Sequence, residues 1–134
     1  MKVFIDSPLF IYLNTIADSK DRVPYENFYI DLLTNYKPYT DVLVLDELIY
    51  VSKRKYGIPY DLTVEFIESS IRPYVIILSL GEDEYVKAAK FMIEYNLKPS
   101  DALHLAAMVN NGMSLIASED REFDKVSLVK RIWV

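Results

Sequence analysis

Hydrophobic and polar positions repeat along this chain with two different periods. Short apolar runs rich in valine and isoleucine indicate buried strands. Between them, apolar residues recur every three to four positions, which is the spacing of an amphipathic helix. Such a stripe, formed by Leu9, Phe10, Leu13 and Ile16, follows Pro8. Because proline suits the first turn of a helix, this pattern predicts a helix that begins at Pro8.

The predicted elements alternate between strands and helices. Strands are predicted at residues 3–6, 74–78, 114–117 and 128–134, with a further short strand overlapping the start of the third helix. Helices are predicted from residue 8, and at residues 25–36, 42–56, 61–71, 82–95 and 99–110. This order favours an α/β fold, with a mostly parallel central sheet and helices on both faces. We expect one domain that spans residues 1–134, with the strand at 74–78 buried.

Polar residues and one glycine mark the ends of two predicted helices. Asp41 or Thr40 can cap the helix at 42–56, and Gly57 is expected to end it. Asp61 is expected to cap the helix that follows. These assignments leave the boundary between the short second strand and the third helix open.

Composition narrows the classes of function. The chain has no cysteine, which excludes disulfides, zinc–thiolate sites and thiol nucleophiles and fits a reducing cytoplasm. Its longest apolar runs are too short to cross a bilayer, and no signal-peptide core is present, so we expect a cytoplasmic protein. The net charge of −5 argues against a basic nucleic-acid binder. Clustered carboxylates that bind cations would reverse that charge locally.

Four carboxylates stand where such a chain could bring them together: Asp6, Glu47, Asp101 and Asp120. Asp6 ends the first predicted strand and Asp120 follows a late one, and ligands of parallel sheets bind beyond the carboxyl ends of strands. Glu47 lies inside an apolar helix, where an unpaired carboxylate is costly. Acids gathered without cysteine predict a site for a hard divalent cation.

Each acid also has a purely structural explanation. Asp6 could cap the helix that follows it, and the helix dipole favours Asp101 in a first turn. Asp120 lies in an acidic loop that solvent would satisfy, and Glu47 could face solvent. We expect His104, the only histidine, to pack or to form hydrogen bonds rather than to bind a ligand. The case for a site therefore depends on the acids taken together.

Four short motifs give the chain a resemblance to a known family. They are VFIDS at residues 3–7, LDEL at 45–48, PSDALHLA at 99–106 and SEDREF at 118–123. In order and spacing they resemble the motifs of the PIN-domain nucleases, particularly the VapC-like toxin ribonucleases of prokaryotic toxin–antitoxin pairs. The resemblance covers nearly the whole chain. In one departure, Pro8 stands where the family often has asparagine.

The resemblance implies a three-layer α/β/α sandwich and a Mg²⁺- or Mn²⁺-dependent endoribonuclease that hydrolyses RNA. It implies a homodimer and a small antitoxin protein as partner. The catalytic, metal-binding acids that it implies are Asp6, Glu47, Asp101 and Asp120, with Ser118 and Asp124 as accessory residues. Arg121 is a further accessory candidate for contacting RNA, because it adjoins Asp120.

Two other functions compete with a nuclease. A PIN-like domain could act mainly as a module that binds RNA or protein, although four mutually repelling acids would then serve no purpose. Phosphotransfer proteins also place aspartate at strand ends. The phosphatases among them need a second aspartate where Pro8 stands, and receiver domains need an adjacent acidic pair that Asp6 and Ser7 do not provide.

Overall fold

Five parallel strands form the centre of the protein, in the spatial order β3-β2-β1-β4-β5. The computed structural model describes residues 1–134. The strands are β1 (Lys2–Ile5), β2 (Lys37–Asp41), β3 (Ile76–Leu78), β4 (Leu115–Ala117) and β5 (Lys130–Ile132). The α/β fold with a parallel sheet, predicted from the alternation of elements, is confirmed.

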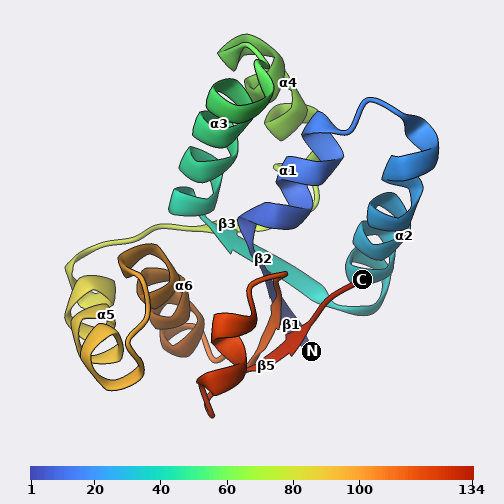
Figure 1. Ribbon diagram of the computed structural model, residues 1–134. Helices are drawn as coiled ribbons and strands as arrows, with labels where there is room; N and C mark the ends of the chain where they lie inside the picture. The colour runs from blue at the N-terminus through green and yellow to red at the C-terminus, as the bar shows by residue number, and fades with distance from the viewer.

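Helices cover both faces of this sheet (Figure 1). They are α1 (Ser7–Thr15), α2 (Ser19–Asn35), α3 (Val42–Tyr56), α4 (Tyr60–Ser70), α5 (Glu82–Tyr95) and α6 (Pro99–Asn110), and a short 3₁₀ helix, η1 (Arg121–Lys125), precedes β5. In Figure 1, α1, α3 and α4 lie on one side of the sheet and α5 and α6 on the other. None of these helices has the length and hydrophobicity that crossing a membrane requires.

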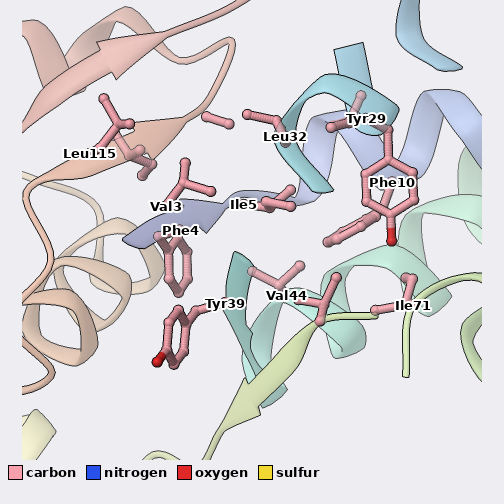
Figure 2. Close-up of a cluster of buried hydrophobic side chains, with 14 of the residues drawn as sticks. Val3, Phe4, Ile5, Phe10, Tyr29, Leu32, Tyr39, Val44, Ile71 and Leu115 are labelled. Carbon is pink, nitrogen blue, oxygen red and sulfur yellow. The ribbon is translucent and has the colours of Figure 1, made fainter. Parts of the chain in front are cut away.

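The main core forms around β1, whose residues Val3, Phe4 and Ile5 are fully buried. Figure 2 shows Val3 and Phe4 on opposite faces of this strand, as the pleat requires. Between α1 and α2, the rings of Phe10 and Tyr29 meet edge to face, with their centroids 5.7 Å apart. A central strand that is buried on both faces explains why the first apolar run of the chain contains no alternating polar residues.

Helix α3 begins and ends where the sequence predicts. Asp41 adopts an extended backbone conformation and accepts a hydrogen bond from the Val44 amide at 3.0 Å, which makes it the N-cap. Gly57 ends the helix in the left-handed conformation, with φ of 70°. Strand β2 ends at Asp41, immediately before α3, so the expected overlap of strand and helix does not occur.

Three local predictions are wrong. Helix α2 begins at Ser19 rather than at residue 25, because the Asp18 side chain caps it at the Lys20 amide and Pro24 is accommodated inside the helix. Asp61 does not cap α4. Pro59 occupies the cap position without a side-chain hydrogen bond, and Asp61 lies in the first turn. Strand β3 is an edge strand, with Ile76 44% exposed, rather than a buried one.

The register of the central strands brings three polar residues to one edge of the sheet. Ile5 of β1 pairs with Ala117 of β4, so Asp6 and Ser118 follow neighbouring strand ends. Phe4 pairs with Tyr39 of β2, and Asp41 ends that strand on the other side of β1. The carboxyl ends of β1, β2 and β4 therefore form a common edge, as parallel pairing dictates.

Candidate functional site

Asp6 occupies the centre of this edge and is 4% exposed. Its Oδ1 accepts a hydrogen bond from the Ser7 amide at 2.8 Å, which makes it the N-cap of α1, and its Oδ2 accepts one from the Ser118 hydroxyl at 2.7 Å. Burial raises the pKa of Asp6, although His104 and these two hydrogen bonds act in the opposite direction. The capping role is thus real, and it leaves Asp6 beside other buried acids.

His104 is completely buried on α6 and lies between two carboxylates. Its Nδ1 is 2.6 Å from Asp41 Oδ2, and its Nε2 is 2.9 Å from Glu47 Oε1. Burial by itself lowers the pKa of His104. The hydrogen bonds with Asp41 and Glu47 and the nearby charge of Asp6 outweigh that effect and raise this pKa well above 6.5.

Glu47 reaches the same edge from α3, with 30% of its side chain exposed. In addition to the His104 contact, its Oε2 accepts a hydrogen bond from the Ser7 hydroxyl at 3.2 Å. Glu47 is therefore turned toward the other acids and held there by two partners. The alternative in which it simply faces solvent is wrong.

Asp101 lies in the first turn of α6 and is 6% exposed. Its Oδ2 is buried and has no hydrogen-bond partner. Burial, together with the neighbouring charges of Asp6 and Asp120, raises the pKa of Asp101 from 3.8 to about 7. The favourable helix dipole thus does not compensate for the surroundings of this carboxylate.

Asp120 closes the cluster on its other side and is the N-cap of η1, where its Oδ1 accepts from the Glu122 amide at 2.9 Å. Its own amide donates to the Ser118 hydroxyl at 3.0 Å. Asp120 Oδ2 is 3.8 Å from Nζ of Lys98, which is largely exposed. Ser118 therefore connects Asp6 with Asp120, as the accessory residue of the predicted motif.

Of the other two accessory candidates, Asp124 does not join the cluster. It pairs with Arg131, whose Nε and Nη2 lie 2.9 Å and 3.2 Å from its two oxygens. This ion pair lowers the pKa of Asp124. Arg131 also donates to the Ser118 carbonyl at 3.1 Å, so it braces the loop after β4. Arg121 adjoins Asp120 and is exposed.

The chemistry of these side chains fits a divalent cation. The buried, unpartnered Asp101 Oδ2 is an acceptor that a cation would satisfy, and carboxylate oxygens are the ligands that Mg²⁺ and Mn²⁺ prefer. In the observed side-chain positions, no three acidic or histidine side chains converge on one point for metal binding. The residues therefore suit such an ion, and at least one of them must move to complete its ligand set.

The structure thus brings Asp6, Glu47, Asp101, Asp120 and Ser118 to one edge of the sheet. Sequence reasoning missed the part that Asp41 and His104 play there. The sequence predicts Asp41 only as a helix cap, although Asp41 ends a strand as Asp6 does, and this shared position is the available signal. His104 does form hydrogen bonds, as expected, but it forms them with the acids of the site.

Comparison with known families agrees with this arrangement. The profile of the PIN domain family matches residues 3–128. A comparison with curated proteins finds no match.

Solved structures with the same fold cover almost the whole chain. VapC20 from Mycobacterium tuberculosis, described as a sarcin–ricin loop cleaving toxin, superposes with a TM-score of 0.75 at 16% identity, over 95% of this chain and 96% of that one. VapBC2 from Rickettsia felis, bound to a promoter DNA fragment, gives 0.73 at 16% identity over 99% and 98%. A toxin–antitoxin complex from Klebsiella pneumoniae gives 0.68 at 15% identity over 96% and 95%. At such identities the likeness shows the fold.

Proposed function

The chain belongs to the PIN domain family, and from that premise we propose that it is a divalent-metal-dependent endoribonuclease that hydrolyses RNA phosphodiester bonds. The observation that carries the proposal is Asp101, a buried carboxylate with an unpartnered oxygen. It lies among the acids at the carboxyl edge of the sheet, and its pKa is raised to about 7. Because such an arrangement is unfavourable in an isolated protein, a cation that relieves it is a sufficient reason for its presence.

We propose Asp6 and Asp101 as the principal ligands of Mg²⁺ or Mn²⁺, with Glu47 and Asp120 completing the shell directly or through water. When bound, the ion supplies a Lewis acid that polarises the phosphate and favours ionisation of a water. The water oxygen forms a bond to phosphorus and the bond to the leaving ribose oxygen breaks. One carboxylate accepts the proton from the water, and the leaving oxygen takes a proton from solvent.

Basic side chains beside the acids are suited to hold the RNA. Lys98 extends into solvent next to Asp120, and Arg121 follows Asp120 in the chain. We propose that these two groups contact phosphates flanking the scissile bond. Ser118 and Arg131 have a different part, because their hydrogen bonds hold Asp6 and the loop of Asp120 in place.

We also propose that the protein is the toxin of a toxin–antitoxin pair, inhibited by a small antitoxin protein, that it forms a homodimer, and that it acts in the cytoplasm. The support is that structures with this fold include a toxin–antitoxin complex. A PIN-like module that binds RNA or protein without cleaving it is the alternative. The unpartnered Oδ2 of Asp101 favours the nuclease, because a binding module gains nothing from an unsatisfied carboxylate oxygen.

The test is incubation of the purified chain with total RNA in EDTA and then with added Mn²⁺ or Mg²⁺. We expect fragments only with the metal, and loss of about 100-fold or more of the cleavage rate in Asp101→Asn. Asp61→Asn is the matched control, because it removes one exposed carboxylate of α4. A folded protein that yields no fragments with either metal would favour the binding module instead.

A further inference from the structure

The imidazole of His104 is held from both sides by acceptors. Nδ1 lies 2.6 Å from Asp41 Oδ2, and Nε2 lies 2.9 Å from Glu47 Oε1. Each ring nitrogen is therefore within hydrogen-bonding distance of a carboxylate oxygen, and neither is open to a metal ion in the observed side-chain positions.

Asp41 fixes the position of this ring relative to α3. It is completely buried, and while its Oδ2 faces His104, its Oδ1 accepts the capping hydrogen bond from the Val44 amide. The same residue therefore ends β2, begins α3 and anchors the imidazole. Helix α3 carries Glu47, and its N-cap Asp41 contacts His104. The cap and the helix together therefore place the imidazole beside Glu47.

Both oxygens of Glu47 have partners within the protein. Oε1 faces His104 Nε2, and Oε2 accepts from the Ser7 hydroxyl. The same Nε2 is 3.8 Å from Asp6 Oδ1, so this ring nitrogen lies close to both Glu47 and Asp6. A cation that bridged these two carboxylates would have to displace it.

The other half of the acid cluster is different. Asp101 Oδ2 is buried without any partner, and two cationic side chains close to Asp120, Lys98 at 3.8 Å and its chain neighbour Arg121, are exposed. Both oxygens of Glu47 thus have partners within the protein, whereas one oxygen of Asp101 has none.

We propose that His104, anchored by Asp41, is a positioning residue that holds Glu47 out of direct metal ligation, so that the divalent ion binds on the Asp101 side. Glu47 then acts on the attacking water and not on the ion. The inference rests on the proposed nuclease function, and it narrows the role of Glu47 within that function.

The first test measures Mn²⁺ binding by titration calorimetry and needs no cleavage. We expect Glu47→Gln to bind Mn²⁺ with an affinity within roughly threefold of the unmodified protein, and Asp101→Asn to bind at least roughly tenfold more weakly, because only the second variant loses a ligand oxygen. If Glu47→Gln loses Mn²⁺ as severely as Asp101→Asn does, Glu47 is a ligand and the proposal is wrong.

The second test separates positioning from a general structural role. His104→Gln keeps one amide donor, but its amide oxygen faces the other carboxylate, so we expect Glu47 to be released. Cleavage by His104→Gln and by Glu47→Gln should fall by about 100-fold each, and the double variant should be no more than about twofold slower than the slower single one. Multiplying losses in the double variant would contradict the proposal.

A matched control and a stability check complete this design. Tyr29→Phe removes a hydrogen bond from Tyr29 to the Ser70 carbonyl, away from the acids, and should change neither Mn²⁺ affinity nor cleavage. If His104→Gln does not fold, the Mn²⁺ comparison of Glu47→Gln with Asp101→Asn decides the proposal by itself. If no variant and no unmodified protein cleaves RNA, the same comparison still tests the role of Glu47, while the nuclease proposal fails separately.

Discussion

At the scale of single residues, the buried acids differ in how their charges are compensated. Asp6 has a hydroxyl donor from Ser118, an amide donor from Ser7 and the nearby His104. Asp101 has an oxygen with no donor, and two acidic neighbours. Burial opposes ionisation of both, but only for Asp6 do local hydrogen bonds counteract it. The metal-free protein should therefore be most sensitive to pH at Asp101.

We predict that Asp101→Asn removes a pH-dependent loss of stability in EDTA. The pKa of Asp101 is raised from 3.8 to about 7 on folding. A raised pKa favours the protonated, folded form, so this contribution is complete below pH 3.8 and is lost as the pH rises through about 7. Between acidic pH and pH 8, the melting temperature of the variant should rise relative to that of the unmodified protein by roughly 10 °C or more, because a pKa shift of this size corresponds to about 4 kcal/mol.

The comparison must be made between the two proteins at each pH, because Asp6 and His104 also have raised pKa values. Asp61→Asn, which changes an exposed acid, is the control and should follow the unmodified protein. Parallel curves for Asp101→Asn and the unmodified protein at every pH would show that Asp101 is not destabilised by its surroundings.

Residue identities and motifs lead to the expectation that the four acids lie near one another, but they do not indicate what holds them. Asp6 and Asp120 follow apolar runs, so their place at strand ends was visible in the sequence. The contact between His104 and Asp41 joins residues 63 positions apart. It depends on α6 packing beside the end of β2, and no local pattern encodes that packing. A lone histidine in an apolar helix therefore predicts a packing or hydrogen-bonding residue, but not the partners of its ring.

At the scale of elements, the sequence predicts a helix boundary correctly where a capping residue marks it. Asp41 and Gly57 delimit α3, and both ends agree with the structure. The prediction failed for α2, whose predicted start at residue 25 lies inside the helix that Asp18 caps. For β3, the apolar run indicated a strand correctly but could not indicate its place at the sheet edge, because strand order is a property of the whole fold.

We predict that substitutions at two helix ends with positive φ change the stability of the protein to different extents. Gly57→Ala should cost about 1 kcal/mol, because its φ of 70° strains any residue with a side chain although no atom blocks the added carbon. Asn96, with φ of 53°, already bears such strain. Asn96→Gly should therefore change stability by less than about 0.5 kcal/mol, as relief of strain offsets the greater freedom of the unfolded chain.

Urea unfolding measures both changes. Gly57 lies at the far end of α3 from the cap at Asp41, so Gly57→Ala should leave Mn²⁺ affinity unaltered. An equal loss of stability in the two variants would mean that the backbone conformation at these helix ends does not determine their preference for glycine.

At the scale of the whole molecule, the net charge of −5 opposes binding to RNA. The proposed function nevertheless requires the protein to bind RNA. Few basic groups adjoin the acid cluster: Lys98 and Arg121 are exposed, and Arg131 is paired with Asp124. Such a surface cannot rely on a broad basic patch. A bound divalent ion would have to supply much of the local attraction, because it reverses the charge of the cluster where the phosphate binds.

We therefore predict that RNA affinity depends strongly on metal and weakly on salt. Glu47→Gln is the suitable protein, since it is expected to keep Mn²⁺ while cleaving slowly, and a fluorescent single-stranded RNA reports binding by anisotropy. With about two phosphate contacts, from Lys98 and Arg121, the slope of log affinity against log salt should be about −1.4 or shallower in EDTA. Added Mn²⁺ should tighten binding by roughly tenfold, because the ion cancels the repulsion between carboxylates and phosphate. A steep slope with equal affinity in EDTA and Mn²⁺ would contradict this prediction, because it would mean that RNA binds a basic surface away from the acids.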